Sequence, residues 1–290
     1  MDTNIDMNVT TEKSLVSIIM PTYNGSARIL SAIESILAQT YTNWELIIVD
    51  DGSTDDTKGI VVNFSTHDSR IIYIKNEANL GIQKSLNRGI SMAKGDYIAR
   101  LDDDDTWNDI AKLEMQVGIF EKEQSCVLVG TGAILVNESG QETMRYLLPA
   151  TDREIRNTLH RKNCFIHSSV MFRRDIAVKL GGYEESQDLR HVEDYDFWLR
   201  MGKEGTLANI SLYAVTLMVR KESLSGKNKI VQLRRILNML KNYRDDYPGF
   251  AIGYFQAMLR VGLYSVFAVI EKIMPKKLWY YLVRVYKERW

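Results

Sequence analysis

Few cysteines, few prolines and no long apolar run set the first limits on this chain. Of its 290 residues, 2 are cysteine and 4 are proline. Two cysteines are too few for a disulfide framework, and neither Cys126 nor Cys164 lies in a metal-type cluster, so we expect both to be reduced core thiols. Residues 1–14 lack the apolar run of a signal peptide, and no stretch reaches the roughly 18 uncharged apolar residues of a membrane-spanning helix. These absences favour a cytoplasmic location.

The chain also lacks a net charge, but its charges are unevenly placed. Residues 226–290 hold 13 Lys/Arg and 4 Asp/Glu, a net of +9, which leaves −9 for residues 1–225. Such asymmetry predicts that the C-terminal part meets something anionic, either a membrane surface or nucleic acid.

Several ligand motifs are missing. There is no G-x-G-x-x-G and no G-x-x-x-x-G-K-[ST], which excludes a dinucleotide fingerprint and a P-loop. The spacing of an EF-hand calcium loop is absent too, and His67, His160 and His191 show no ligand spacing.

What is present is an alternation of strands and helices. Continuous apolar runs predict buried strands at 15–20, 45–49, 71–75 and 97–101. Apolar residues at helical spacing predict helices at 29–37, 82–93 and 110–120. This order is typical of βαβ units, so we expect an α/β fold with a mainly parallel sheet flanked by helices.

The second half is less regular. Strands are expected at 126–136 and 166–174, and a helix within 191–205 that ends near Gly202. Beyond residue 226 the pattern is helical, with breaks at Pro248-Gly249 and at Pro275. We therefore expect one α/β domain at 1–225 and a basic, amphipathic helical C-terminal extension at 226–290.

Three polar loops, 21–26, 50–57 and 102–106, each follow a predicted strand. Ligands of open parallel sheets bind beyond the carboxyl ends of the strands, so these loops are a candidate site. The alternative for each loop alone is a simple turn.

The third loop carries four consecutive aspartates, residues 102–105. Two carboxylates one residue apart at a strand end can converge on Mg²⁺ or Mn²⁺, which prefer oxygen ligands. Alternation along an extended chain points Asp103 away from Asp102 and Asp104. The alternative is a solvated turn rich in aspartate.

The second loop contains Asp50-Asp51-Gly52-Ser53. A carboxylate at this place is suited to accept hydrogen bonds from a base or a ribose. A turn that caps the following helix explains the same residues.

Five segments now resemble, in order, family 2 glycosyltransferases of the GT-A fold, a Rossmann-like α/β architecture found in bacterial surface-polysaccharide enzymes. The resemblance covers about residues 15–225. It rests on "VSIIMPTYNG", "SILAQTYTNWELIIVDDGSTDDT", "ANLGIQKSLNRGISMAKGDYIARLDDDD", "HSSVMFRR" and "VEDYDFWLRM".

The resemblance implies a nucleotide-sugar donor, a divalent cation and inversion at the anomeric carbon. Residues that would bind the nucleotide are Pro21, Thr22 and Tyr23 at the uracil and ribose, and Asp51 at the base. The D-x-D signature matches Asp102, towards the ribose or metal, and Asp104, on the metal. Asp105 matches a fourth, usually acidic, position.

The family's Glu-Asp pair matches Glu193 and Asp194, and the resemblance makes Asp194 the catalytic base. A base that accepts the proton of the acceptor hydroxyl typically contributes about 10²–10⁴-fold. The alternative is an acidic first helical turn that is favoured by the helix dipole.

One position departs from the family pattern. Arg220 stands where relatives often have a histidine, three residues before the Ser-x-Ser pair. An arginine does not ligate a cation but can pair with a diphosphate, so Arg220 is expected at the donor. The alternative is a surface arginine at a strand end. His167, at the start of a predicted strand, either approaches the acceptor or packs in the fold.

The expected partners are a UDP-hexose donor, a lipid-linked acceptor such as polyprenyl-diphosphate GlcNAc, and no nucleic acid. A nucleotidyltransferase is disfavoured because "PTYNGSA" contains no basic residue for a triphosphate, and a non-catalytic binding module is disfavoured because the aspartates are retained. A processive synthase is disfavoured too. Such enzymes carry a Gln-x-x-Arg-Trp motif, and "QLRRI" lacks its tryptophan.

The stretch from 250 to 290 has seven Lys/Arg and two Glu among many aromatic and apolar residues. This composition is typical of helices that lie in the headgroup region, so a peripheral place at the inner face of the cytoplasmic membrane is expected. The alternative is that these helices pack on the catalytic domain or in a homodimer.

Overall fold

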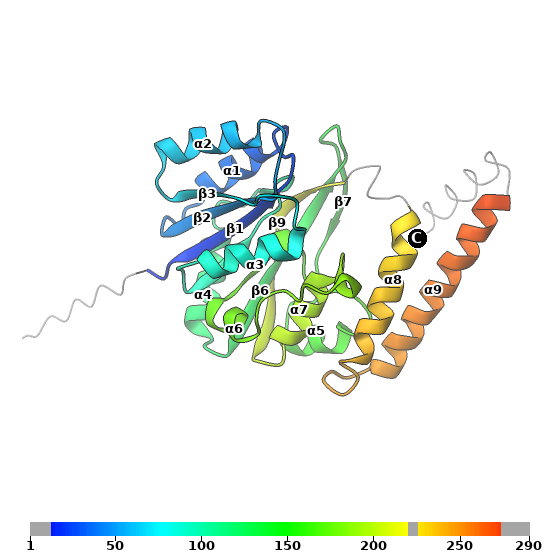
Figure 1. Cartoon of the computed structure of the whole chain (residues 1–290). Coiled ribbons are helices and arrows are strands. Elements are labelled where there is room, and N and C mark those ends of the chain that lie inside the picture. Colours follow the sequence, from blue (N-terminus) through cyan, green and yellow to red (C-terminus); the bar gives the residue numbers. More distant parts are fainter. Residues whose placement is uncertain (1–12, 220–225, 274–290) are drawn as a thin grey trace, which may run out of the picture.

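The computed structural model describes residues 13–219 and 226–273, and these form one mixed sheet with helices on both faces (Figure 1). The sheet has nine strands in the order β3-β2-β1-β4-β8-β6-β9-β5, with β7 paired to β6. The strands are β1 (Val16–Thr22), β2 (Trp44–Asp50), β3 (Ile71–Lys75), β4 (Tyr97–Arg100), β5 (Thr106–Trp107), β6 (Cys126–Val136), β7 (Glu142–Tyr146), β8 (Met171–Arg173) and β9 (Thr206–Met218). The α-helices are α1 (Ile29–Leu37), α2 (Thr57–His67), α3 (Ile82–Met92), α4 (Lys112–Lys122), α5 (Asp152–Thr158), α6 (Arg174–Lys179), α7 (Glu193–Met201), α8 (Gly226–Lys241) and α9 (Phe250–Ile273).

The first half of the sheet is parallel and confirms the expected α/β fold. Strands β3, β2, β1 and β4 lie side by side and run in one direction, with Ile19 opposite both Ile47 and Arg100. Every residue of β1, β2 and β4 is buried. Their continuous apolar runs arise because helices cover both faces of this part of the sheet.

The second half is mixed. Strand β8 is antiparallel to both β4 and β6, whereas β6 and β9 are parallel. The strand expected over 166–174 is wrong in its first part, because a 3₁₀ turn (His167–Ser169) precedes the short β8. The hydroxyl and the backbone N–H of Ser169 both donate to the carbonyl of Ile166, and such local bonds compete with a strand ladder.

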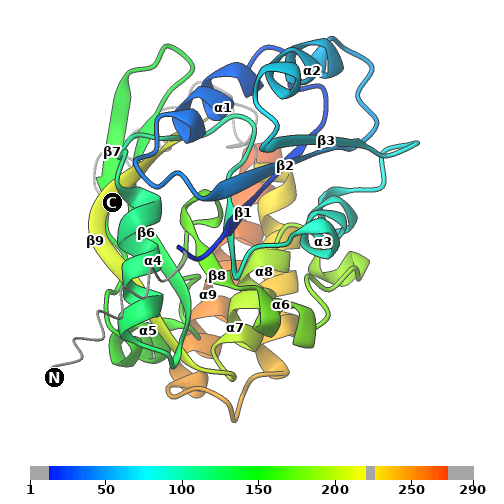
Figure 2. The ribbon, with the colours of Figure 1, turned by 90° about the vertical axis from the view of Figure 1, so that its left-hand side faces the viewer.

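Helices lie on both sides of the sheet (Figure 2), and two clusters of buried apolar residues fill the space between sheet and helices. One contains buried residues of α1, α2 and α4, including Ile33, Val61 and Phe120. The other contains residues of α3, α6 and α7, and there Phe197 and Trp198 contact Phe172 of β8. The carboxyl ends of the parallel strands stay open between these clusters.

The C-terminal helices α8 and α9 lie side by side and pack on the α7 side of the domain (Figure 1). Met239 and Leu240 of α8 belong to the same apolar cluster as Trp198, and the Tyr247 hydroxyl donates to the carbonyl of Leu199 at 2.6 Å. The expected break falls between α8 and α9, whereas Pro275 lies outside the described residues. In the part of the chain that the structure describes, none of the helices is both long and apolar enough to cross a bilayer. The division into 1–225 and 226–290 stays a prediction.

Candidate functional site

Three loops meet at the carboxyl ends of β1, β2 and β4, which are neighbours in the sheet. The backbone N–H of Asn24 donates to the Ser53 hydroxyl at 2.9 Å, and the Thr22 hydroxyl donates to Asp103 at 2.6 Å. A Cβ on Gly25 would lie 2.3 Å from Asp103 Oδ2 and from Thr22 Oγ1, so a larger residue would have to displace these two side-chain oxygens. The loops expected to converge at 21–26, 50–57 and 102–106 are therefore in contact.

The four consecutive aspartates face two ways. Asp102, Asp104 and Asp105 each bring a carboxylate oxygen to within 4.8 Å of the others. Asp103 points away from this group towards Thr22 and lies 3.6 Å from the guanidinium of Arg28. Burial raises the pKa of Asp103 to about 6, against the opposing effects of Thr22 and Arg28.

A buried arginine holds one carboxylate of the cluster in place. Arg100, the last residue of β4, is 1% exposed and both of its terminal nitrogens donate to the carboxylate of Asp102. Burial alone would raise the pKa of Asp102, but the charge and hydrogen bonds of Arg100 hold it below its usual value. Asp102 is therefore ionised and fixed in direction.

Asp105 behaves differently from Asp102. Burial, followed by the charge of Asp102, raises the pKa of Asp105 to about 8, although a hydrogen bond with Ser168 opposes the shift. The Ser168 hydroxyl lies 2.5 Å from Asp105 Oδ2 and 3.2 Å from Asp102 Oδ2, so it ties the two carboxylates together. A second positive charge beside Arg100 would lower the pKa of Asp105 and favour its ionised form.

A divalent cation fits this donor set. Mg²⁺ and Mn²⁺ take oxygen ligands and need few protein carboxylates, and three such groups lie within reach of one ion here. The cluster gathers more negative charge than Arg100 alone neutralises, which is the electrostatic condition for holding a cation. Asp102 and Asp104, expected as ligands from the D-x-D spacing, are joined by Asp105.

A strand-end cavity of about 540 Å³ opens on the β1 side of the cluster. All the residues expected to bind the nucleotide, apart from Arg220, line it: Pro21, Thr22, Tyr23, Asp51 and Asp102. Arg220 lies outside the described residues. Tyr23 is 47% exposed, so its ring is available to a ligand.

Asp51 is held rigidly in this strand-end cavity. Its Oδ1 accepts from the side chain of Asn76 and from the backbone N–H of Leu80, each at 2.8 Å. Its Oδ2 accepts from the N–H of Gly81 at 2.9 Å. An oxygen with a single donor keeps a lone pair for a further hydrogen bond.

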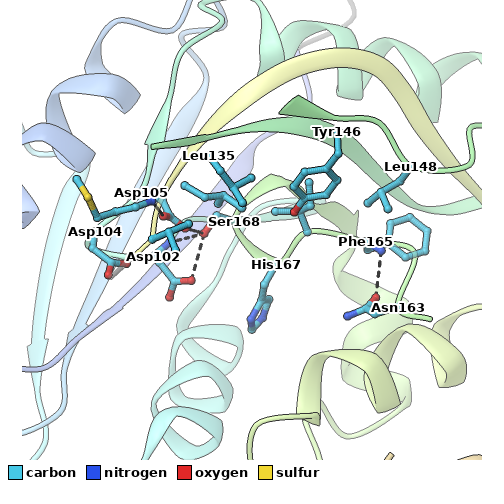
Figure 3. A pocket seen from close by; sticks show the side chains of 14 residues that line it. Asp102, Asp104, Asp105, Leu135, Tyr146, Leu148, Asn163, Phe165, His167 and Ser168 are labelled. Atoms are coloured by element: carbon cyan, nitrogen blue, oxygen red, sulfur yellow. Dashed lines mark hydrogen bonds between the residues drawn. The ribbon is translucent and has the colours of Figure 1, made fainter. Parts of the chain in front are cut away.

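A second, hairpin cavity of about 500 Å³ opens on the other side of the cluster (Figure 3). Its acidic end consists of Asp102, Asp104 and Asp105, and its far end carries Tyr146 and Leu148 beside Phe165. The hairpin of β6 and β7 therefore supplies an apolar wall opposite three carboxylates.

His167 lines the hairpin cavity and packs in the fold at once. Its Nε2 lies 2.9 Å from the Tyr183 hydroxyl, and its ring contacts the ring of Trp198 edge to face. Burial, followed by the charge of Arg100, holds the pKa of His167 well below its usual value, so the ring is neutral.

Glu193 and Asp194 begin helix α7; Glu193 lines one cavity, and Asp194 is bonded to a residue that lines the other. Glu193 is 6% exposed and lines the strand-end cavity. Asp194 accepts a hydrogen bond of 2.8 Å from the side chain of Asn163, which lines the hairpin cavity. Burial, followed by the charge of Glu193, raises the pKa of Asp194 to about 7, which places its titration near neutral pH.

Three residues of the site were not predicted from the sequence. Arg100 had a signal, because a charged residue inside a fully buried strand needs a partner. Ser168 and Asn163 had none, because their partners, Asp102 and Asp194, lie 66 and 31 residues away.

Comparison with known proteins places this geometry in a family. Residues 17–181 match the model of "Glycosyl transferase family 2". The "Putative glycosyltransferase EpsE" of Bacillus subtilis is 38% identical over 215 residues, covering 74% of this chain and 76% of that protein. The "UDP-Glc:alpha-D-GlcNAc-diphosphoundecaprenol beta-1,3-glucosyltransferase WfgD" of Escherichia coli is 34% identical over 252 residues, covering 86% of this chain and 94% of that protein.

Solved structures show the same fold. A mannosyltransferase from Pyrobaculum calidifontis in complex with GDP-Man and Mn²⁺ has a TM-score of 0.68 at 16% identity, covering 96% of this chain and 81% of that one. TarS 1-349 of S. aureus in complex with UDP-GlcNAc has a TM-score of 0.63 at 19% identity, covering 82% and 69%. With a family model that matches more than half of its length, the chain belongs to glycosyl transferase family 2 and has the GT-A fold.

Proposed function

We propose that this glycosyltransferase moves one hexose from a UDP-linked donor to a hydroxyl of a lipid-linked saccharide, with inversion, in the synthesis of a bacterial surface polysaccharide. The observation that carries the proposal is the pairing of two cavities around one carboxylate, Asp102. Glu193 faces one cavity and Asp194 is bonded to a wall residue of the other. A transferase needs two substrate sites that meet at the reacting atoms.

The strand-end cavity suits a nucleoside diphosphate. Asp51 offers an acceptor to a base, and Tyr23 offers an exposed ring. The hairpin cavity, with its apolar wall, suits the acceptor sugar, since sugar rings present apolar faces to aromatic side chains. WfgD, named as a glucosyltransferase that acts from UDP-Glc on GlcNAc-diphosphoundecaprenol, supports a donor and an acceptor of these classes.

The chemistry follows from the position of Asp194. Its carboxylate accepts the proton of the acceptor hydroxyl while that oxygen forms a bond to the sugar C1. The bond between C1 and the diphosphate oxygen breaks, and its electron pair leaves with the diphosphate. Attack from the face opposite the leaving group inverts C1, so an α-linked donor gives a β-linked product. Asn163 keeps the carboxylate aimed and partly ionised at neutral pH.

Asp104 and Asp105, together with Asp102, would hold Mn²⁺ or Mg²⁺ beside the strand-end cavity. Such an ion supplies counter-charge for the leaving diphosphate. Arg100 contributes independently of it, because it fixes the direction of Asp102 before any ligand binds.

The outer face of α9 supports a membrane location. An apolar stripe runs along it at helical spacing, and each of its members is 50–57% exposed: Ile252, Phe255, Leu259, Leu263 and Val266. The net charge of +9 over residues 226–290 would attract anionic headgroups, at about 1 kcal/mol for each basic residue near the surface. The stripe is therefore proposed to lie on the cytoplasmic face of the membrane, where a lipid-linked acceptor is held.

A donor and acceptor screen tests the proposal. The full-length protein with Mn²⁺ is offered UDP-hexoses, UDP-N-acetylhexosamines and GDP-mannose, each with a polyprenyl-diphosphate GlcNAc acceptor, and the product linkage is determined by NMR. One donor should give a β-linked disaccharide. Transfer of a nucleotidyl group, or nucleotide-sugar binding without transfer or hydrolysis, would replace the proposal by a nucleotidyltransferase or a binding module.

A further inference from the structure

The rim of the strand-end cavity carries a short turn with two basic residues. Among the described residues that line this cavity, four are acidic, namely Asp51, Asp102, Asp103 and Glu193, and the basic ones are Arg190 and His191. Both basic side chains are exposed at the rim. A diphosphate entering an acidic cavity needs positive groups or hydrogen-bond donors at the point where it lies.

The backbone of this turn is unusual. His191 has a φ of 68°, a left-handed conformation that a non-glycine residue seldom adopts. Such a conformation is unfavourable for a non-glycine residue and persists when the surroundings hold it in place. One residue, Val192, separates the turn from Glu193 and Asp194, so the position of the turn affects the start of helix α7.

Helix α8 holds the turn through two side-chain hydrogen bonds. The side chain of Gln232 donates to the carbonyl of His191 at 2.9 Å, and Arg235 Nη1 donates to the carbonyl of Arg190 at 2.7 Å. The two donors are three residues apart, so they lie on one face of the helix. They use both carbonyls of the turn, whose two residues line the cavity.

We propose that α8 is part of the donor site, in which Gln232 and Arg235 act as positioning residues that hold the Arg190–His191 turn against the donor diphosphate. The inference rests on the proposed nucleotide-sugar chemistry and adds Arg190 and His191 as diphosphate contacts. The Arg190 guanidinium pairs with phosphate oxygens. The His191 imidazole donates an N–H, and the approaching anion favours its protonated form.

The alternative for the two α8 bonds is that they only attach the helix to the domain. This attachment has another source, because Met239 and Leu240 are 2% and 1% exposed in the shared apolar cluster. The two explanations differ in one measurable property. A positioning role affects binding of the phosphates more than binding of the nucleoside, whereas loss of attachment affects folding stability.

The test compares UDP with uridine on the full-length protein. The variants are Arg190→Ala, His191→Asn and the double variant Gln232→Ala/Arg235→Ala, and asparagine is chosen because it tolerates the left-handed backbone. Arg234→Ala is the matched control, since it removes the same charge from the next position of α8 and Arg234 is exposed without a hydrogen bond or ion pair among the described residues. UDP binding with Mn²⁺ is measured by calorimetry, uridine binding by ligand-observed NMR, and folding by thermal denaturation.

The expected result is a loss of about tenfold in UDP affinity for Arg190→Ala and for the double variant, which corresponds to one charge-assisted hydrogen bond. His191→Asn should lose less, and uridine affinity should stay within about twofold in all variants, as should both affinities in Arg234→Ala. Equal losses for UDP and uridine, or UDP binding unchanged in Arg190→Ala and the double variant, would overturn the inference and leave the proposed function intact. A wild-type protein that binds no UDP would overturn both.

Discussion

Replacing Asp194 by asparagine is the sharpest test of the catalytic assignment. The side chain keeps its shape and can still accept the 2.8 Å hydrogen bond from Asn163, so the fold and the cavities should remain. What disappears is the ability to take a proton. At saturating donor, transfer should fall by about 10²–10⁴-fold, the range of general-base effects, while UDP affinity stays unchanged.

The pH dependence gives a second magnitude. Burial, then the charge of Glu193, raises the pKa of Asp194 to about 7, and the carboxyl is protonated and inactive as a base below that pH. A base with this pKa is about 9% ionised at pH 6 and about 91% at pH 8, so kcat/KM of the free enzyme should rise about tenfold between them. Arg100 opposes the shift, as does the hydrogen bond from Asn163. Asn163→Ala should therefore move the acid limb to higher pH.

Initial rates across pH 5–9 with wild type, Asp194→Asn and Asn163→Ala decide the matter. Glu193→Gln is the comparison variant. It should cost less in rate because Glu193 lines the strand-end cavity, and its acid limb should move to lower pH because the charge of Glu193 raises the pKa of Asp194. Near-wild-type transfer by Asp194→Asn, or a pH profile that Asn163→Ala leaves unmoved, would refute the assignment of Asp194 as the base.

Three further outcomes are expected. Asp104→Ala should abolish Mn²⁺-dependent UDP binding in calorimetry. Asp103→Ala should be milder, because Asp103 points towards Thr22. The reverse order would contradict the assignment of Asp104 as a metal ligand. Phe255→Ser/Leu259→Ser should weaken binding to anionic liposomes, measured by sedimentation, about a hundredfold, since each exposed side chain contributes at least about 1.5 kcal/mol when buried. Wild-type protein that does not bind liposomes at low salt would contradict the membrane proposal. Arg100→Gln leaves Asp102 without its counter-charge, so the melting temperature should fall. Mn²⁺ should raise the melting temperature of this variant more than that of wild type, and equal increases in both proteins would contradict this.

The parallel half of the fold and the convergence of its loops follow from sequence for a simple reason. Strands buried on both faces carry continuous apolar runs, and the carboxyl ends of parallel neighbours share one edge. The runs at 15–20 and 45–49 correspond to β1 and β2, which end at Thr22 and Asp50, next to the D-x-D loop. Local patterns suffice where neighbouring strands are joined by right-handed helical crossovers.

Part of the second half was also predicted: the strand at 126–136 corresponds to β6, and the helix expected to end near Gly202 corresponds to α7. The rest resisted prediction because its patterns are not local. Strand β9 pairs with β6 through several register shifts, and an irregular register breaks the period of two on which a strand is recognised. Strand β7 is exposed over four of its five residues and shows no alternation. The partner of Asp194 comes from a loop near Asn163 that carries no motif, so only the folded chain reveals it.

The two cavities draw on different parts of the chain and share Asp102. Among the described residues, the β6–β7 hairpin and β9 line the hairpin cavity and contribute nothing to the strand-end cavity. If the hairpin cavity holds the acceptor, as proposed, mutations in these elements can alter which sugar is extended while the nucleotide side stays as it was. The same separation suggests an engineering experiment. Exchanging residues 135–148 between relatives should transfer the preference for an acceptor without transferring the preference for a donor.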